Sequence, residues 1–311
     1  MRRLSILLIL LLASCARPSS VDLEPFIGGK EGVQASFADL REHVFDGGND
    51  PFDVVIRIDN HGEAAISRDN VVVRLDGINP LAFGKTEDQL TRKPTDDVLA
   101  NEQRVDGVIK SPAQFLEFQG LNHLTTITGS KLQYPLRANV CYGYKTQAVS
   151  KFCVRRNILS PQEGPCVISE EKPVHNSGAP IHVENVKETA RGADKVGISF
   201  DIKHVGSGKP YTKGSGCPDL EKNRNRVFVK IDTGMKGLDC TGLTRAGEFV
   251  EGTVQLFDGA KTITCTQTVP KGDFEQPVDI TVNYDYETFA QTTLVVKHAG
   301  DRTGQVTLQA E

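Results

Sequence analysis

The sequence has no tryptophan, and aromatic residues of all kinds make up only 6% of it. Basic residues are not in excess, because 36 Lys and Arg stand against 40 Asp and Glu. Proteins that bind nucleic acids usually carry a basic patch or stripe, so this balance argues against nucleic acid as a partner. The Gly-x-Ser-x-Gly elbow, the His-Glu-x-x-His helix and the Rossmann glycine fingerprint are all missing. We therefore expect a protein that is not an enzyme and that needs no cofactor.

Long apolar runs are also missing, apart from one at the start of the chain, Leu4 to Leu12. Arg2 and Arg3 precede it, and small residues follow it. A basic start, a short apolar stretch and small residues before a cleavage point are the parts of an export signal. A short transmembrane helix is the alternative, but even the longer stretch Leu4 to Ala16 has only about 13 residues, and a spanning helix takes roughly 20.

The apolar run ends in Leu12-Ala13-Ser14-Cys15, which resembles the lipobox of membrane-anchored lipoproteins. The resemblance implies a signal peptide of residues 1–14 and a lipid on Cys15. Residues 15–24 would then be a short lipidated tether, and the membrane would be a partner through that lipid. We expect a membrane-anchored cell-envelope protein on the extracytoplasmic face. An ordinary secretory signal without lipid on Cys15 is the alternative.

Six cysteines follow the lipobox: Cys141, Cys153, Cys166, Cys217, Cys240 and Cys265. An even number in an exported chain indicates three disulfides, and six cysteines allow 15 pairings. Pairing between neighbours along the chain is the simplest of these: Cys141–Cys153, Cys166–Cys217 and Cys240–Cys265. Metal binding competes with this interpretation. It is disfavoured because no Cys-x-x-Cys pair occurs and no histidine stands at ligand spacing beside these residues.

Short runs of Val, Ile and Thr, separated by turns in a chain with 29 glycines, are typical of strands. In the clearest example, apolar residues alternate with others from Phe52 to Ile58 and again from Val71 to Leu75. The turn residues Asn60-His61-Gly62-Glu63 lie between them. This order resembles the CARDB-like surface modules, which implies an immunoglobulin-like sandwich and no particular activity.

The chain contains an internal repeat. Residues 135–148 align without a gap with residues 277–290, and six of the 14 positions are identical. Upstream, residues 58–62 match 202–206, and 71–75 match 227–231. Agreement at three places in the same order indicates duplication. The predicted fold class is therefore all-β, with two tandem immunoglobulin-like β-sandwich domains, residues 25–157 and 166–298, after the lipoprotein signal.

The repeated Val-x-Tyr-x-Tyr pattern places Tyr142 and Tyr144 on one face of a strand, and Tyr284 and Tyr286 on one face of another. We interpret them as structural tyrosines that pack their rings and bond their hydroxyls at a sandwich corner. An exposed aromatic platform for a ligand is the alternative.

Two hairpins are predicted. One covers Pro135 to Arg155 and turns at Thr146 and Gln147, with a cysteine on each arm. The other covers residues 252–266 and turns at Asp258-Gly259, which is a strong hairpin signal.

Other candidate motifs are weak. Gly206 to Lys209 resembles a phosphate loop only superficially, because Pro210 stands where Ser or Thr is needed. His61 and His204 occupy related positions in the repeat, and we interpret them as turn residues. Four residues could supply oxygens to calcium, although turn formation explains them equally well: Asp46, Asn49, Asp50 and Asp53.

The leading hypothesis is a lipid-anchored interaction or scaffolding module that engages another envelope protein or a glycan. The alternative is a ligand- or solute-binding lipoprotein with an inter-domain cleft. A third is an architectural subunit of an envelope layer.

Overall fold

The computed structural model describes residues 24–159, 164–217 and 220–300. Within these ranges the chain forms strands and four short 3-10 helices, which confirms the predicted all-β class and the sandwich architecture. The 3-10 helices are η1 (Arg68–Asn70), η2 (Pro80–Phe83), η3 (Asp88–Leu90) and η4 (Glu221–Asn223). No helix among the described residues has the length and apolarity of a membrane span. The signal peptide and Cys15 lie outside the described residues.

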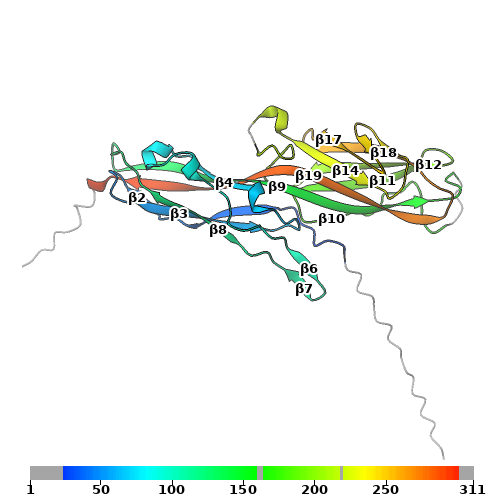
Figure 1. Ribbon diagram of the computed structural model, residues 1–311, viewed down its shortest axis with the longest axis horizontal. Coiled ribbons are helices and arrows are strands. Elements are labelled where there is room, and N and C mark those ends of the chain that lie inside the picture. Colours follow the sequence, from blue (N-terminus) through cyan, green and yellow to red (C-terminus); the bar gives the residue numbers. More distant parts are fainter. Residues whose placement is uncertain (1–23, 160–163, 218–219, 301–311) are drawn as a thin grey trace, which may run out of the picture.

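The strands form two lobes that lie end to end (Figure 1). In the first lobe, one layer has the strand order β1-β3-β8, and the other contains β2, β4 and β5. A separate two-stranded sheet, β6–β7, projects from this lobe (Figure 1). The bounds are β1 (Val33–Asp39), β2 (His43–Phe45), β3 (Phe52–Asn60), β4 (Val71–Asp76), β5 (Thr91–Arg92), β6 (Glu102–Arg104), β7 (Gly107–Ile109) and β8 (Gln114–Leu121).

The second lobe repeats this plan. One layer has the order β11-β12-β18-β15, and the other contains β10, β13, β14, β16 and β17. The bounds are β10 (His175–Asn176), β11 (Ile181–Ala190), β12 (Lys195–His204), β13 (Lys209–Tyr211), β14 (Arg226–Asp232), β15 (Leu238–Cys240), β16 (Thr244–Ala246), β17 (Phe249–Gln255) and β18 (Ala260–Thr268).

Two strands of 24 residues, β9 (Lys131–Val154) and β19 (Phe274–Lys297), run through both lobes. They pair antiparallel without a register shift, from Lys131 opposite Lys297 to Val154 opposite Phe274. Through them the second layers of the two lobes form one ten-stranded sheet. The predicted hairpin at Thr146 and Gln147 is therefore wrong. Buried and less buried side chains alternate through this point, and neither residue favours a turn.

The aligned repeat segments take equivalent places in the two lobes. Val73 of β4 pairs with Val140 of β9, and Val229 of β14 pairs with Val282 of β19. The sequence predicts domains at residues 25–157 and 166–298. The last strand of each range, β9 or β19, runs through both lobes. Residues 160–163, between the two predicted domains, lie outside the described residues.

The predicted hairpin of residues 252–266 has the expected turn but not the expected pairing. Asp258 and Gly259 both have positive φ, and Phe257 and Ala260 exchange two backbone hydrogen bonds. Beyond this bridge the strands separate: β17 pairs with β14 and β16, whereas β18 pairs with β12 and β15. The turn thus connects the two layers of the sandwich instead of two neighbouring strands.

All six cysteines that follow the lipobox form disulfides: Cys141–Cys217, Cys153–Cys166 and Cys240–Cys265. The expected nearest-neighbour pairing is right for the last pair and wrong for the other two. Cys141 and Cys153 lie 12 residues apart on one strand, so they cannot meet. Each bonds instead to a cysteine on a segment that packs against β9.

Candidate functional site

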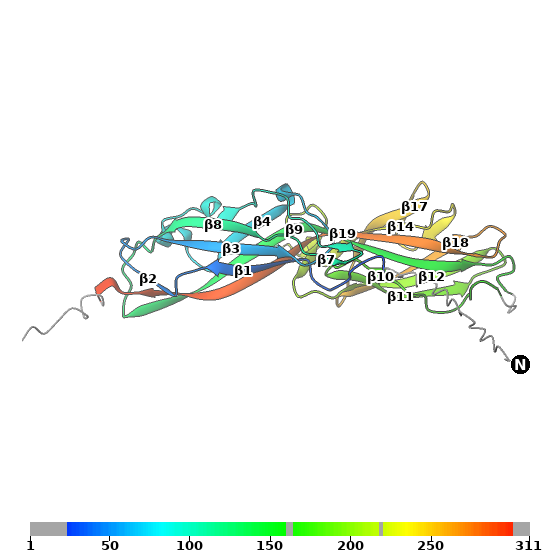
Figure 2. The same ribbon diagram turned by 90° about the horizontal axis from the view of Figure 1, so that it is seen from below.

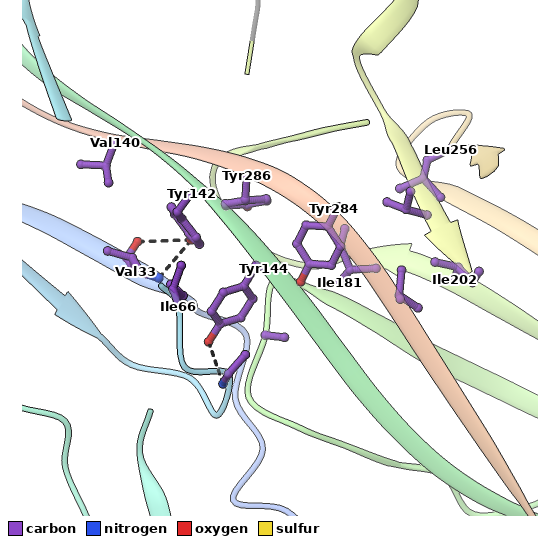
Figure 3. Close-up of a cluster of buried hydrophobic side chains, with 14 of the residues drawn as sticks. Val33, Ile66, Val140, Tyr142, Tyr144, Ile181, Ile202, Leu256, Tyr284 and Tyr286 are labelled. Carbon is purple, nitrogen blue, oxygen red and sulfur yellow. Dashed lines mark hydrogen bonds between the residues drawn. The ribbon is translucent and has the colours of Figure 1, made fainter. Parts of the chain in front are cut away.

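The two lobes meet where β9 and β19 pass between them, and we call this region the waist, residues 142–144 and 284–286 (Figure 3). On the inner face of the sheet four tyrosine rings pack together there. Centroids of neighbouring rings lie between 5.5 and 6.3 Å apart. The rings are buried, which confirms the structural interpretation of the Val-x-Tyr-x-Tyr pattern. The four residues are Tyr142, Tyr144, Tyr284 and Tyr286.

Each tyrosine hydroxyl is hydrogen-bonded. The hydroxyl of Tyr142 accepts from the backbone N–H of Val33, at 3.0 Å (Figure 3). That of Tyr144 donates to Oδ1 of Asn60, at 3.0 Å. These bonds fasten the first strands of the lobe to the waist.

The second repeat has corresponding bonds. The hydroxyl of Tyr286 lies 2.8 Å from Nε2 of His204 and accepts from the N–H of Gly208 at 2.7 Å. His204 stands where the first repeat has Asn60. The hydroxyl of Tyr284 bonds to that of Thr146, at 3.0 Å. His204 is the last residue of β12 and not a turn residue as predicted, and its ring holds the hydroxyl of Tyr286.

Burial sets the ionisation of the waist. It raises the pKa of Tyr142 and of Tyr284 well above the usual value, and neighbouring tyrosines add to the effect. It raises the pKa of Tyr286 to about 12. The pKa of His204 is lowered, also by burial. All these groups are therefore neutral at pH 7, and the tyrosines keep the protons that their hydrogen bonds use.

The outer face of the sheet carries a hollow at the same place. It has a volume of about 480 Å³ and is lined by both lobes. Gly143 contributes no side chain to its floor, and a Cβ added there would meet other atoms only at 3.7 Å, which is ordinary contact. Asp69, Asn70 and Val72 lie at the side of the first lobe, and Asn283 comes from β19.

A loop that follows β13 covers one side of the hollow. Asp285, on β19, accepts hydrogen bonds from the N–H groups of Gly214 and Gly216, at 2.9 and 2.6 Å. The disulfide Cys141–Cys217 ties the same loop to β9. Two backbone donors on one carboxylate and a covalent bond hold the loop in one position.

Two lysines stand at the hollow, Lys145 from β9 and Lys213 from the loop. Among the described residues neither has an acidic side chain within salt-bridge distance, and Lys213 instead lies over the ring of Phe228, 5.4 Å from its centroid. The hollow therefore offers two ammonium donors and two asparagine amides to a polar molecule.

The residues considered for calcium point to different partners. Asp46 accepts from Nδ1 of His298 and from two backbone N–H groups, and these bonds lower its pKa to about 2. Asp50 pairs with Arg41 at 2.9 Å, and Asp53 accepts from the N–H of Gly120. In the part of the chain that the structure describes, no group of three or more His, Cys, Asp or Glu could hold a metal ion.

Among the predicted site residues that the structure describes, only Cys141 lines the hollow, and its disulfide partner is Cys217. Sequence reasoning missed Gly143, Lys145, Lys213 and Asp285. The repeat alignment held one signal: Gly143 aligns with Asp285, so the two repeats differ at the centre of their best-matched segment.

No protein-family model matches the sequence, and no curated protein is similar to it at a significant level.

Proposed function

We propose that this chain is a lipid-anchored cell-envelope protein that acts as a rigid interaction module for another envelope protein or a glycan. The lipobox-like stretch ending in Cys15 supports the anchor, and three disulfides fit an oxidising, extracytoplasmic compartment. The observation that carries the function is the uninterrupted β9–β19 ladder through the waist. It joins the lobes without a hinge and presents the hollow in a fixed shape.

This rigidity separates the proposal from its main alternative. Many solute-binding proteins close two domains around the ligand by bending a few hinge residues. Here, bending at the waist would break ladder pairs such as Tyr142–Tyr286 and separate the packed rings. A preformed surface that meets a partner without closing agrees better with this construction.

Crosslinking in intact cells, followed by capture of the full-length protein, tests the proposal. The hollow supplies the matched variants. Gly143→Leu fills the floor of the hollow, and Lys145→Glu reverses one of the charges at the hollow. Both residues lie on the outer face of the sheet. We expect both variants to fold like the wild type and to lose the partner. If both variants still recover the same partner, the binding surface lies elsewhere on the molecule. If no envelope protein or glycan is captured, the proposed function is contradicted.

Binding of a soluble ligand is a second candidate, because the volume of the hollow lies within the range of small-molecule sites. A ligand that binds only the folded state raises its melting temperature. A screen of polar metabolites and short glycans for such a rise, lost in Gly143→Leu, would favour this alternative.

A further inference from the structure

The β6–β7 hairpin has no strand partner in the described chain, because these two strands form a sheet of their own. Three apolar side chains of the hairpin are exposed: Val105 at the turn by 82%, and Val108 and Ile109 on β7 by 48% and 52%. A lone two-stranded hairpin is marginally stable in water, and several exposed apolar side chains gathered on one projecting element favour an interaction site. This hairpin therefore has the features of an element that meets a partner.

The base of the hairpin and the start of the described chain are held by one turn, residues 60–63. Asn101, just before the hairpin, donates from its backbone N–H to the carbonyl of Gly62, at 2.9 Å. Glu63, from the same turn, accepts from the N–H groups of Ile27 and Gly28, at 2.9 and 3.0 Å. Both views show the hairpin and these first residues side by side near the waist (Figures 1 and 2).

The length of the tether limits how the body can stand on a membrane. Eight residues, 16–23, separate Cys15 from Glu24, so the fully extended tether reaches about 30 Å. Glu24 pairs with His175, which lies opposite Val149 of β9. From Val149 to the first-lobe end of β9 at Lys131 the strand extends about 60 Å. The tether is therefore too short for the molecule to stand on the end of its first lobe.

We propose that the molecule lies along the lipid bilayer and that the tip of the β6–β7 hairpin is a second membrane contact beside the lipid anchor. This inference rests on the proposed function, because it requires lipid on Cys15. Of the stances that the tether permits, only this one brings the apolar tip to the membrane. Asp106 at the turn and Arg104 beside it keep the contact within the headgroup region.

The same stance has a consequence for the hollow. The hollow opens on the outer face of the ten-stranded sheet, and the segment that carries η4 rises on this side of the waist, away from the hairpin (Figure 1). With the hairpin against the bilayer, the hollow faces outward, where a second envelope component can reach it.

The missing tryptophan makes the test clean, because one introduced tryptophan is the only one in the chain. The full lipidated chain carrying Val105→Trp is placed in phosphatidylcholine vesicles with brominated acyl chains. We expect the emission to shift to shorter wavelength and to be quenched. Two controls of high exposure should show neither effect: Leu81→Trp in the first lobe and Val167→Trp at the far end of the second lobe. Changing Val108 and Ile109 to Asp in the Val105→Trp background should abolish the quenching.

A second measurement uses the lipidated chain without any substitution, because an introduced tryptophan itself favours membrane interfaces. Vesicles should protect the bonds after Arg104 and Lys110 from trypsin. The intact mass of the same sample reports the lipid on Cys15. If the lipidated Val105→Trp variant is not quenched, or if the Val167→Trp control is quenched instead, this inference is overturned and the anchor stays in place. If the intact mass shows no lipid on Cys15, both the proposed anchor and the membrane contact of the hairpin are overturned.

Discussion

Tyr142 and Tyr286 face each other as direct partners in the β9–β19 ladder, with ring centroids 5.8 Å apart. In the repeat alignment Tyr142 matches Tyr284, not Tyr286. The paired rings thus come from different positions of the two repeats, as expected when two equivalent strands cross about a local twofold axis. Each repeat sends its last strand into the other lobe, and the waist becomes part of the core instead of a linker.

Tyr142→Phe tests whether the waist hydroxyls fasten the lobes. The substitution keeps the ring and removes the acceptor of the buried Val33 N–H. A buried backbone donor without a partner costs about 2 kcal/mol, so the free energy of unfolding should fall by about that amount. Urea denaturation measures it. An unchanged midpoint would show that the bond contributes nothing.

Gly62→Ala tests the close packing of the turn against the waist. A Cβ at this position would overlap the hydroxyl of Tyr144 and the carbonyl of Gly178. Overpacking of this kind should cost about 3 kcal/mol. Gly192→Ala is the matched control, because a Cβ there meets nothing within 4 Å. If thermal melting shows equal stability for both variants, the packing argument is wrong.

The three disulfides should contribute unequally. They close segments with sequence separations of 76, 25 and 13 residues. Chain entropy predicts losses of about 4.5, 3.5 and 3 kcal/mol when each pair is replaced by serine. The largest loss belongs to Cys141–Cys217, which also holds the loop at the hollow. Denaturation of the three double variants measures the order, and peptide mapping of the oxidised protein checks the pairing itself.

His204 should make stability fall in mild acid. Burial lowers the pKa of this histidine in the folded state, so the unfolded chain takes up the proton first as the pH falls below about 6.5. Stability is therefore complete above that value and is lost toward the lower folded pKa, by at most about 1.4 kcal/mol per pH unit. Protonation would also leave Nε2 only as a donor toward the Tyr286 hydroxyl.

The first repeat supplies the control for this prediction. Asn60 occupies the equivalent position and accepts a hydrogen bond from Tyr144 without titrating. His204→Asn should therefore keep the fold and flatten the stability profile below pH 6.5. If the stability of this variant depends on pH as that of the wild type does, the effect comes from another group.

The strands themselves were predictable from alternation, because one buried face repeats every second residue. The burial of Tyr142 and Tyr144 followed from the same pattern. What alternation could not give is the length of β9. Most strands have 3–10 residues, which favoured a hairpin at Thr146, and only a partner more than 100 residues later in the chain supports a strand of 24.

Pairing over long distances accounts for the other errors. The local chemistry of Asp258-Gly259 determines a tight turn, but the neighbours of β17 and β18 are chosen by the rest of each sheet. Likewise, the spacing of the cysteines does not reveal that the loop ending at Cys217 folds over β9. The hollow at the waist was missed for the same reason, because its residues come from segments that are far apart in the sequence.

The central claim is that β9 and β19 continue unbroken through the waist and make the two lobes one body. Native-state hydrogen exchange of the full chain tests it most directly. The account predicts that amides of residues 140–146 and 282–288 exchange as slowly as those in the cores of both lobes. Fast exchange confined to these two segments, with each lobe protected on its own, would contradict it.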